Sequence, residues 1–339
     1  MARPLRIEFP GAVYHVMARG NQGRPIFQDD KDRRCFLETL GEAGEKTGCR
    51  VHAYVLMGNH YHLLLDTPEG NLVAGMKWLQ GVYTQRYNSH HRLFGHLFQG
   101  RYKAVIVDGQ DKACFSVVST YIHLNPARAG LIRIGEEKLK QYRWSSYPWY
   151  LNRANQGPVW LCRERVMGSL GFSPTEGKGY EAYIESRVLE LGMEAGRKEL
   201  EEEWKGLRRG WYLGGESFLE HLKGRLAGAV KAYRRESLSG PAKKTHDEAA
   251  AERWLAAGAK ELGVDLGRLE ELPKGAPQKL ALAWWLRERT TVSLRWVSER
   301  LGMGHYTRVT QAISRMRRKP GRKLEGMKRQ LLKCALNNT

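Results

Sequence analysis

Residues 50–66, which read RVHAYVLMGNHYHLLLD, decide the fold of the first part of this chain. Two apolar segments rich in Val, Leu and Tyr flank the dipeptide Gly58-Asn59, which is typical of a tight turn. The pattern therefore predicts a β-hairpin with strands over residues 50–57 and 60–66.

Further elements are expected on both sides of this hairpin. Residues 13–18 and 101–107 predict two more strands, because apolar residues alternate or cluster there and turn signals follow. Residues 29–46, 71–90 and 111–128 predict helices from their apolar spacing and their start signals. The order β-α-β-β-α-β-α indicates an α+β fold with a ferredoxin-like, mostly antiparallel sheet.

Positive charge is concentrated near the end of the chain. The 339 residues carry a formal net charge of +20. Residues 1–150 hold 20 basic and 13 acidic side chains, whereas residues 275–333 hold 15 and 3. The middle of the chain is almost neutral, and its acidic runs are typical of solvated helix faces. Such an excess indicates a polyanionic partner, most simply nucleic acid.

Two polar segments that break regular structure divide the chain, at residues 240–244 and 272–277. Together with the charge distribution they predict a first domain over residues 1–150. A helical connector over 151–274 and a basic C-terminal module over 275–339 follow it.

Several classes of protein are disfavoured by the composition. No apolar run approaches the roughly 18 residues of a membrane span, and no signal peptide is evident at the start. Five widely spaced cysteines without a C-x-x-C pair favour a reducing cytosol over a disulfide scaffold. No G-x-x-x-x-G-K-[ST] motif occurs, so no nucleotide cofactor is expected. The sequence thus predicts a cytoplasmic protein that does not enter a membrane.

A pair of histidines is the first candidate for chemistry. Strand side chains alternate, so His60 and His62 share one face and can chelate a divalent cation, although a third ligand must come from elsewhere. In the helix expected over residues 111–128, Tyr121 and Asn125 are four residues apart and lie one above the other. Taken alone, each feature also fits an ordinary structural role, so both interpretations stay open at this point.

Six motifs follow one another in the first 150 residues. They are GAVYHV (residues 11–16), ARGN (18–21), MGNHYHLL (57–64), GHLFQGRYK (95–103), YIHLNPARAGL (121–131) and YRWSSY (142–147). Together and in this order they resemble the HUH-type single-tyrosine transposases, and within them the REP-associated tyrosine transposases. The resemblance covers about residues 5–150 and implies the HUH transposase fold for them.

The resemblance implies a reaction and a role for each candidate. Tyr121 would attack a phosphodiester of single-stranded DNA near a hairpin, giving a 5′-phosphotyrosine and a free 3′-hydroxyl. His60, His62 and Asn125 would hold Mg²⁺ or Mn²⁺, which polarises the scissile phosphate and stabilises the departing oxygen. The covalent link keeps the energy of the broken bond, so rejoining needs no ATP.

The third metal ligand is open at this stage. Asn125 precedes Pro126, and a residue before proline is biased away from helical dihedral angles. The helix could break there, and water or another side chain could take the place of the asparagine.

Two segments supply candidates for DNA contact. They are the turn after the first strand and the GHLFQGRYK motif, where Arg and Lys suit phosphates. Phe98 and Tyr102 could stack on unpaired bases, with core packing as the alternative for Phe98. The candidates are Arg19, Asn21, Arg24, Gln99, Arg101 and Lys103.

The C-terminal module has its own DNA-binding pattern. Residues 278–318 combine two apolar helices, the turn Gly302-Met303-Gly304 and a polar helix, which predicts a helix-turn-helix. The stretch resembles the C-terminal DNA-binding domain of the bacterial replication initiator DnaA; a basic helical tail that reads no sequence is the alternative. The residues expected to face DNA are Tyr306, Thr307, Arg308, Thr310, Gln311 and Arg315.

Two functions from different classes follow from these patterns. The first is a bacterial, metal-dependent transposase or endonuclease that cleaves and rejoins single-stranded DNA near hairpins, as a monomer or a homodimer. The second is a non-catalytic protein that recognises palindromic repeats or regulates transcription. The complete set of His60, His62 and Tyr121 favours the first, because a binding protein has no chemical need for all three.

Overall fold

The structure is a computed structural model that describes residues 7–151, 157–233, 241–318 and 320–336. The chain forms two compact units, residues 1–228 and residues 229–339. Each unit has its own core of buried apolar side chains. Among the described residues, no helix has both the length and the apolar character needed to cross a membrane.

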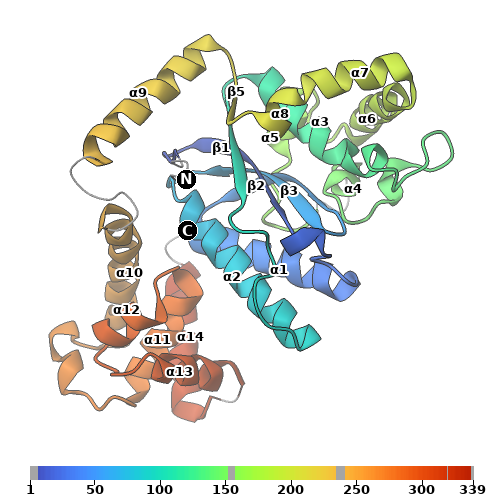
Figure 1. Ribbon diagram of the computed structural model, residues 1–339. Coiled ribbons are helices and arrows are strands. Elements are labelled where there is room, and N and C mark those ends of the chain that lie inside the picture. Colours follow the sequence, from blue (N-terminus) through green and yellow to red (C-terminus); the bar gives the residue numbers. More distant parts are fainter. Residues whose placement is uncertain (1–6, 152–156, 234–240, 319, 337–339) are drawn as a thin grey trace. The chain divides into compact units, whose positions relative to one another are not determined.

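A five-stranded sheet lies at the centre of the first unit, in the order β2-β3-β1-β4-β5 (Figure 1). The first four of these strands pair antiparallel, and the last joins the edge of β4 in parallel. The strands are β1 (Ala12–Arg19), β2 (Arg50–Leu56), β3 (His60–Thr67), β4 (Lys103–Val107) and β5 (Tyr212–Leu213).

Helices cover both faces of this sheet (Figure 1). The helices α1 (Asp30–Thr47) and α2 (Leu72–His91) pack on one face, where the ring of Tyr61 lies 4.8 Å from that of Phe36. The helix α3 (Lys112–Arg128) packs on the other face. Because side chains alternate along β3, the histidines on either side of Tyr61 face α3.

Local signals explain where these helices begin and end. The Asp29 carboxylate caps α1 by accepting from the backbone N–H of Asp32 at 2.8 Å, and Gly48 ends the helix with a positive φ of 68°. Asp111 caps α3 in the same way. The expected break at Pro126 does not occur, because α3 continues through the proline to Arg128.

The rest of the first unit is mainly helical, and two of its helices, α5 (Glu164–Ser169) and α6 (Gly177–Gly192), pack against α3. The tryptophan between two of these helices, Trp204, is fully buried. The elements are η2 (Leu139–Gln141), α4 (Tyr147–Leu151), α5 (Glu164–Ser169), α6 (Gly177–Gly192), α7 (Glu194–Glu203), α8 (Lys205–Arg209) and α9 (Glu216–Tyr233).

The second unit consists of helices around a core that includes Trp285 and Leu286 (brown to red in Figure 1). Its first helix contributes Ala251 and Leu255 to this core. Its elements are α10 (Pro241–Glu261), η3 (Leu266–Glu271), α11 (Pro277–Arg289), α12 (Leu294–Arg300), α13 (Thr307–Arg318) and α14 (Arg322–Leu336).

The predicted α+β architecture is confirmed, with an antiparallel sheet followed by helices. One detail differs from the expectation of a purely helical connector. Residues 212–213 form β5, because their backbone groups satisfy the free edge of β4. This pairing ties the connector to the sheet that carries the histidines.

Candidate functional site

The histidine pair lies on the sheet face that α3 covers. Strand pairing places Arg19 opposite His60 and Met17 opposite His62, so these four side chains share one face. The imidazole centroids of His60 and His62 are 5.2 Å apart. The two rings are therefore close enough to face a common ligand.

A third histidine, His15, belongs to this cluster and was not singled out from the sequence. Its Nε2 lies 2.9 Å from Nδ1 of His62, and the two rings are stacked at 5.1 Å. Alternation along β1 places His15 on the same face as Met17 and Arg19. The sequence does not specify the register between β1 and β3, which brings this face beside His62.

Tyr121 of α3 reaches the same cluster. Its ring centroid is 5.5 Å from that of His62 and 5.5 Å from that of His15, edge-on in both cases. The side chain is 4% exposed. The structure thus brings together the three residues that the sequence analysis selected from separate elements, His60, His62 and Tyr121.

Asn125 is placed on the same helix, one turn after Tyr121, and is buried. Its Nδ2 donates to the backbone carbonyl of Tyr121 at 3.4 Å, which is a contact within its own helix. Its role as a metal ligand therefore stays a prediction.

The imidazoles of the cluster are held in the neutral form. Burial lowers the pKa of His15 to about 3, and burial with the nearby charges of Arg19 and Arg128 lowers the pKa of His60 to about 4. Burial, followed by the neighbouring imidazoles, also lowers the pKa of His62. Neutral imidazole is the form that binds a metal, so no proton has to be removed at neutral pH.

Hydrogen bonds to Nδ1 leave the other ring nitrogens available. Nδ1 of His60 lies 2.7 Å from Oδ1 of Asn59, an acceptor, so this nitrogen carries the hydrogen and Nε2 has the free lone pair. Nδ1 of His62 lies 2.9 Å from Nε2 of His15, and in the tautomer in which His62 donates this hydrogen bond its Nε2 has a free lone pair as well. The donor set therefore fits a divalent cation held through two Nε2 atoms.

The connector covers the tyrosine. Trp204 packs edge-on against the Tyr121 ring at 5.2 Å, and the guanidinium of Arg128 lies 5.5 Å from that ring. Glu201 pairs with Arg128 at 3.0 Å, which links the two segments by charge. This contact was not predicted, because the run KELEEEWKGLRR at residues 198–209 carries no sequence motif that indicates a functional role.

The two segments expected to contact DNA lie side by side. The backbone N–H of Asn21 donates to Leu97 O at 2.8 Å, and that of Gln99 donates to Arg19 O at 2.9 Å. The N–H of Gly20 donates to Asn59 O at 2.8 Å, so the joined segments adjoin the turn before His60. Five of the six residues that were predicted to contact DNA in these two segments are exposed, and Lys103 is half-buried. The exposed residues are Arg19, Asn21, Arg24, Gln99 and Arg101.

The expected stacking role of two aromatic residues is not supported. Phe98 is 7% exposed and Tyr102 is 6% exposed, and both belong to the apolar core. Phe98 packs against Tyr61 and Tyr83 on the face covered by α1 and α2. The alternative of core packing is therefore the observed one for Phe98, and it holds for Tyr102 too.

In the second unit, α13 has one buried and one exposed face. Val309, Ala312 and Met316 are buried, and Ile313 is half-buried. A turn with positive φ at Gly302 and Gly304 connects this helix to α12. The six residues expected to face DNA are all exposed: Tyr306, Thr307, Arg308, Thr310, Gln311 and Arg315.

Acidification is expected to destabilise the first unit, because two buried histidines are neutral in the folded state. Burial lowers the pKa of both His15 and His123 to about 3. Below pH 6.5 the unfolded chain binds protons that the folded chain does not, so each histidine lowers the free energy of unfolding by about 1.4 kcal/mol per pH unit. Because the unfolded histidines are only half protonated at pH 6.5, denaturant unfolding should show a loss of about 3 kcal/mol between pH 6.5 and pH 5. An unchanged free energy over this range contradicts the neutral buried state.

The part of the chain that carries the histidine pair and Tyr121 matches a known family of proteins. Residues 9–125, about a third of the chain, match the family described as "Transposase IS200 like". None of the curated proteins matches the chain at a significant level. A solved structure of a REP-associated tyrosine transposase bound to a REP hairpin is similar to the chain with a TM-score of 0.38 and 12% identity. That similarity covers 48% of this chain and 92% of the other one.

The family match includes both histidines of the pair, Tyr121 and Asn125. It confirms the predicted transposase resemblance for residues 9–125. The resemblance of the C-terminal segment to a helix-turn-helix domain stays a prediction.

Proposed function

We propose that residues 9–125, which match the IS200-like transposases, form the catalytic part of a metal-dependent enzyme that cleaves and rejoins single-stranded DNA near hairpins. One observation carries the proposal. The ring of Tyr121, a potential nucleophile, lies 5.5 Å from that of His62, and His60 shares the same face of the sheet. A nucleophile next to two neutral imidazoles is what metal-assisted attack on a phosphate requires.

In the proposed reaction the Tyr121 hydroxyl attacks the scissile phosphorus. A bond forms between the phenol oxygen and the 5′ phosphate, the bond to the 3′ oxygen breaks, and the released 3′ end takes up a proton. Attack by a 3′-hydroxyl on the phosphotyrosine reverses the step and rejoins the strand. The number of phosphoester bonds is unchanged at each step, so no ATP is required.

His60 and His62 are proposed to hold Mg²⁺ or Mn²⁺ through their Nε2 atoms, with Asn125 as the third protein ligand. When bound, this ion polarises the phosphate and stabilises the departing 3′ oxygen. His15 and Asn59 keep the two imidazoles in place through their hydrogen bonds to Nδ1. Such contacts fix the ring orientation and the tautomer of a ligating histidine.

The joined segments beside the histidine pair are proposed as the path of the single strand. Arg19 and Arg24 flank the short helix η1 (Asn21–Gly23), and Arg101 follows the segment that pairs with it. An exposed arginine suits a phosphate, and the amides of Asn21 and Gln99 suit phosphates or base edges. Because Trp204 packs on Tyr121, we infer that the segment with Trp204 moves when DNA reaches the hydroxyl.

The exposed face of α13 is proposed to bind the duplex stem of the hairpin. Replacement of Arg308 and Arg315 by Ala should reduce the slope of log affinity against log salt by about 2, because two phosphate contacts are lost. Fluorescence anisotropy with a hairpin oligonucleotide at several salt concentrations measures this slope. Arg253→Ala, an exposed change on α10, is the matched control. A slope that stays the same in the double variant excludes these two contacts.

The proposed function is tested by incubating the whole chain with a hairpin-bearing single strand and Mg²⁺. We expect a covalent protein–DNA band on a denaturing gel, and we expect EDTA to prevent it. DNA binding without any covalent band would instead support the non-catalytic binding protein.

A further inference from the structure

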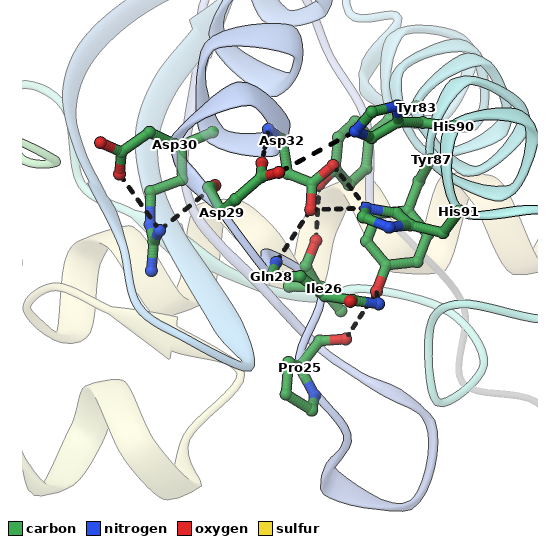
Figure 2. Close-up of polar contacts among 11 residues, drawn as sticks. Pro25, Ile26, Gln28, Asp29, Asp30, Asp32, Tyr83, Tyr87, His90 and His91 are labelled. Carbon is green, nitrogen blue, oxygen red and sulfur yellow. Dashed lines mark hydrogen bonds and ion pairs between the residues drawn. The ribbon is translucent and has the colours of Figure 1, made fainter.

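A second cluster of potential metal ligands lies where α1 begins and α2 ends (Figure 2). It consists of Asp32 from the first turn of α1 and of His90 and His91, the last two residues of α2. These helices cover the face of the sheet opposite to His60 and His62. The cluster is therefore separate from the proposed catalytic site.

The three side chains converge closely. Nε2 of His91 lies 2.9 Å from both carboxylate oxygens of Asp32. One ligand atom from each of Asp32, His90 and His91 lies within 4.8 Å of the others. Ligand atoms around a tetrahedral metal with bonds of about 2.0–2.2 Å are roughly 3.3–3.6 Å apart, so side-chain shifts of about 1 Å suffice to admit an ion.

Burial and a hydrogen bond fix the position of the Asp32 carboxylate. Asp32 is 2% exposed, and its Oδ2 accepts from the backbone N–H of Gln28 at 2.8 Å. Its own N–H donates to Oδ1 of Asp29 at 2.8 Å. Oδ2 of Asp29 is 3.9 Å from Nε2 of His90, so a second carboxylate stands at the border of the cluster.

A simple ion pair does not account for the whole arrangement. His91 alone would be enough to pair with Asp32. The adjacent His90 places a second imidazole nitrogen within 4.8 Å of the same carboxylate, and the centroids of the two imidazoles are 4.6 Å apart. Two imidazoles and a carboxylate are a set that favours Zn²⁺ and related transition metals over Mg²⁺ or Ca²⁺, which prefer oxygen ligands.

We propose that Asp32, His90 and His91 bind a zinc-type divalent cation, with Asp29 as the fourth ligand. The ion links the first turn of α1 to the last turn of α2. Four ligands from the protein give a closed tetrahedral site, which is typical of a structural rather than a catalytic metal.

Hydrogen bonds connect this site to the segment that follows Arg24. The hydroxyl of Tyr87 in α2 accepts from Nε2 of Gln28 at 2.8 Å and donates to Pro25 O at 3.4 Å. Figure 2 shows these residues beside the cluster. A bound ion should therefore also steady residues 25–28, which continue directly from the proposed DNA-contact turn.

The experiment uses the full chain with His60→Ala and His62→Ala, so that the first histidine pair cannot bind metal. Calorimetric titration with Zn²⁺ alone should show one equivalent bound, and zinc should raise the melting temperature. Millimolar Mg²⁺ should not displace it. Because this background lacks the proposed catalytic ligands, the result does not depend on the proposed function.

His90→Ala in this background is the decisive variant. The ion pair recorded for His90 is a 3.9 Å contact to Asp29, so the change removes a ligand with little effect on folding, which circular dichroism checks. We expect zinc affinity to fall at least about tenfold. The matched control, His96→Ala, removes an exposed histidine outside the cluster and should leave affinity unchanged. Absence of zinc binding in the background, or equal affinity with and without His90, would overturn the proposal.

Discussion

Tyr121→Phe is expected to abolish the covalent protein–DNA adduct while DNA binding survives. The substitution removes the hydroxyl and keeps the ring, which packs against His15, His62 and Trp204. Loss of a covalent nucleophile lowers the rate by about 10⁴-fold or more, so no adduct should be detected. Gel analysis of the adduct and anisotropy of DNA binding on the same preparation separate the two effects.

A matched control for this change is Tyr183→Phe. The hydroxyl of Tyr183 lies 3.4 Å from that of Thr120, the residue that precedes Tyr121 on α3. The variant therefore removes a neighbouring phenol with little structural effect. It should form the adduct at the rate of the unaltered chain. An adduct in Tyr121→Phe, or its loss in both variants, contradicts the assignment of the nucleophile.

The double substitution His60→Ala and His62→Ala should have the second largest effect. Without both imidazoles the ion is not held beside Tyr121, and a phenol attacking an unpolarised phosphate is slow. We expect the rate of adduct formation to fall by at least about 10³-fold, a reduction of more than 4 kcal/mol in transition-state stabilisation. Single-turnover kinetics across a range of Mg²⁺ and Mn²⁺ concentrations measure this loss.

Binding of the DNA itself should change little in this variant, because the proposed phosphate contacts lie in the adjoining segments. His221→Ala, which removes an exposed imidazole on α9 outside the proposed DNA path, serves as the control. Metal-dependent cleavage that persists in the double variant excludes His60 and His62 as the metal ligands.

Replacing His15 with Ala should raise the metal concentration needed for the half-maximal rate. The rate at saturating metal should stay closer to that of the unaltered chain than the rate of the double variant does.

Elements with strong local patterns were predictable from the sequence. The hairpin of β2 and β3 follows from two apolar segments around Gly58-Asn59, and it placed His60 and His62 on one face. The caps at Asp29 and Asp111 marked the starts of α1 and α3. Such signals operate within a few residues, so one sequence is enough to read them.

Features that depend on contacts between distant segments were not predictable. The pairing of His15 with His62 needs the register between β1 and β3, which local periodicity does not specify. The packing of Trp204 against Tyr121 depends on how the connector is positioned against α3, which local sequence patterns do not specify. Pro126 stays helical for a related reason, since buried packing along α3 outweighs a weak local preference.

The central claim is that Tyr121 becomes covalently joined to DNA, and peptide mapping tests it most directly. Trypsin releases residues 113–128 as ACFSVVSTYIHLNPAR, in which Tyr121 is the single tyrosine. After the adduct is trimmed with nuclease and digested with trypsin, tandem mass spectrometry should locate a 5′-nucleotide remnant on Tyr121. A remnant on any other residue, or its presence on the corresponding peptide of Tyr121→Phe, would contradict the account.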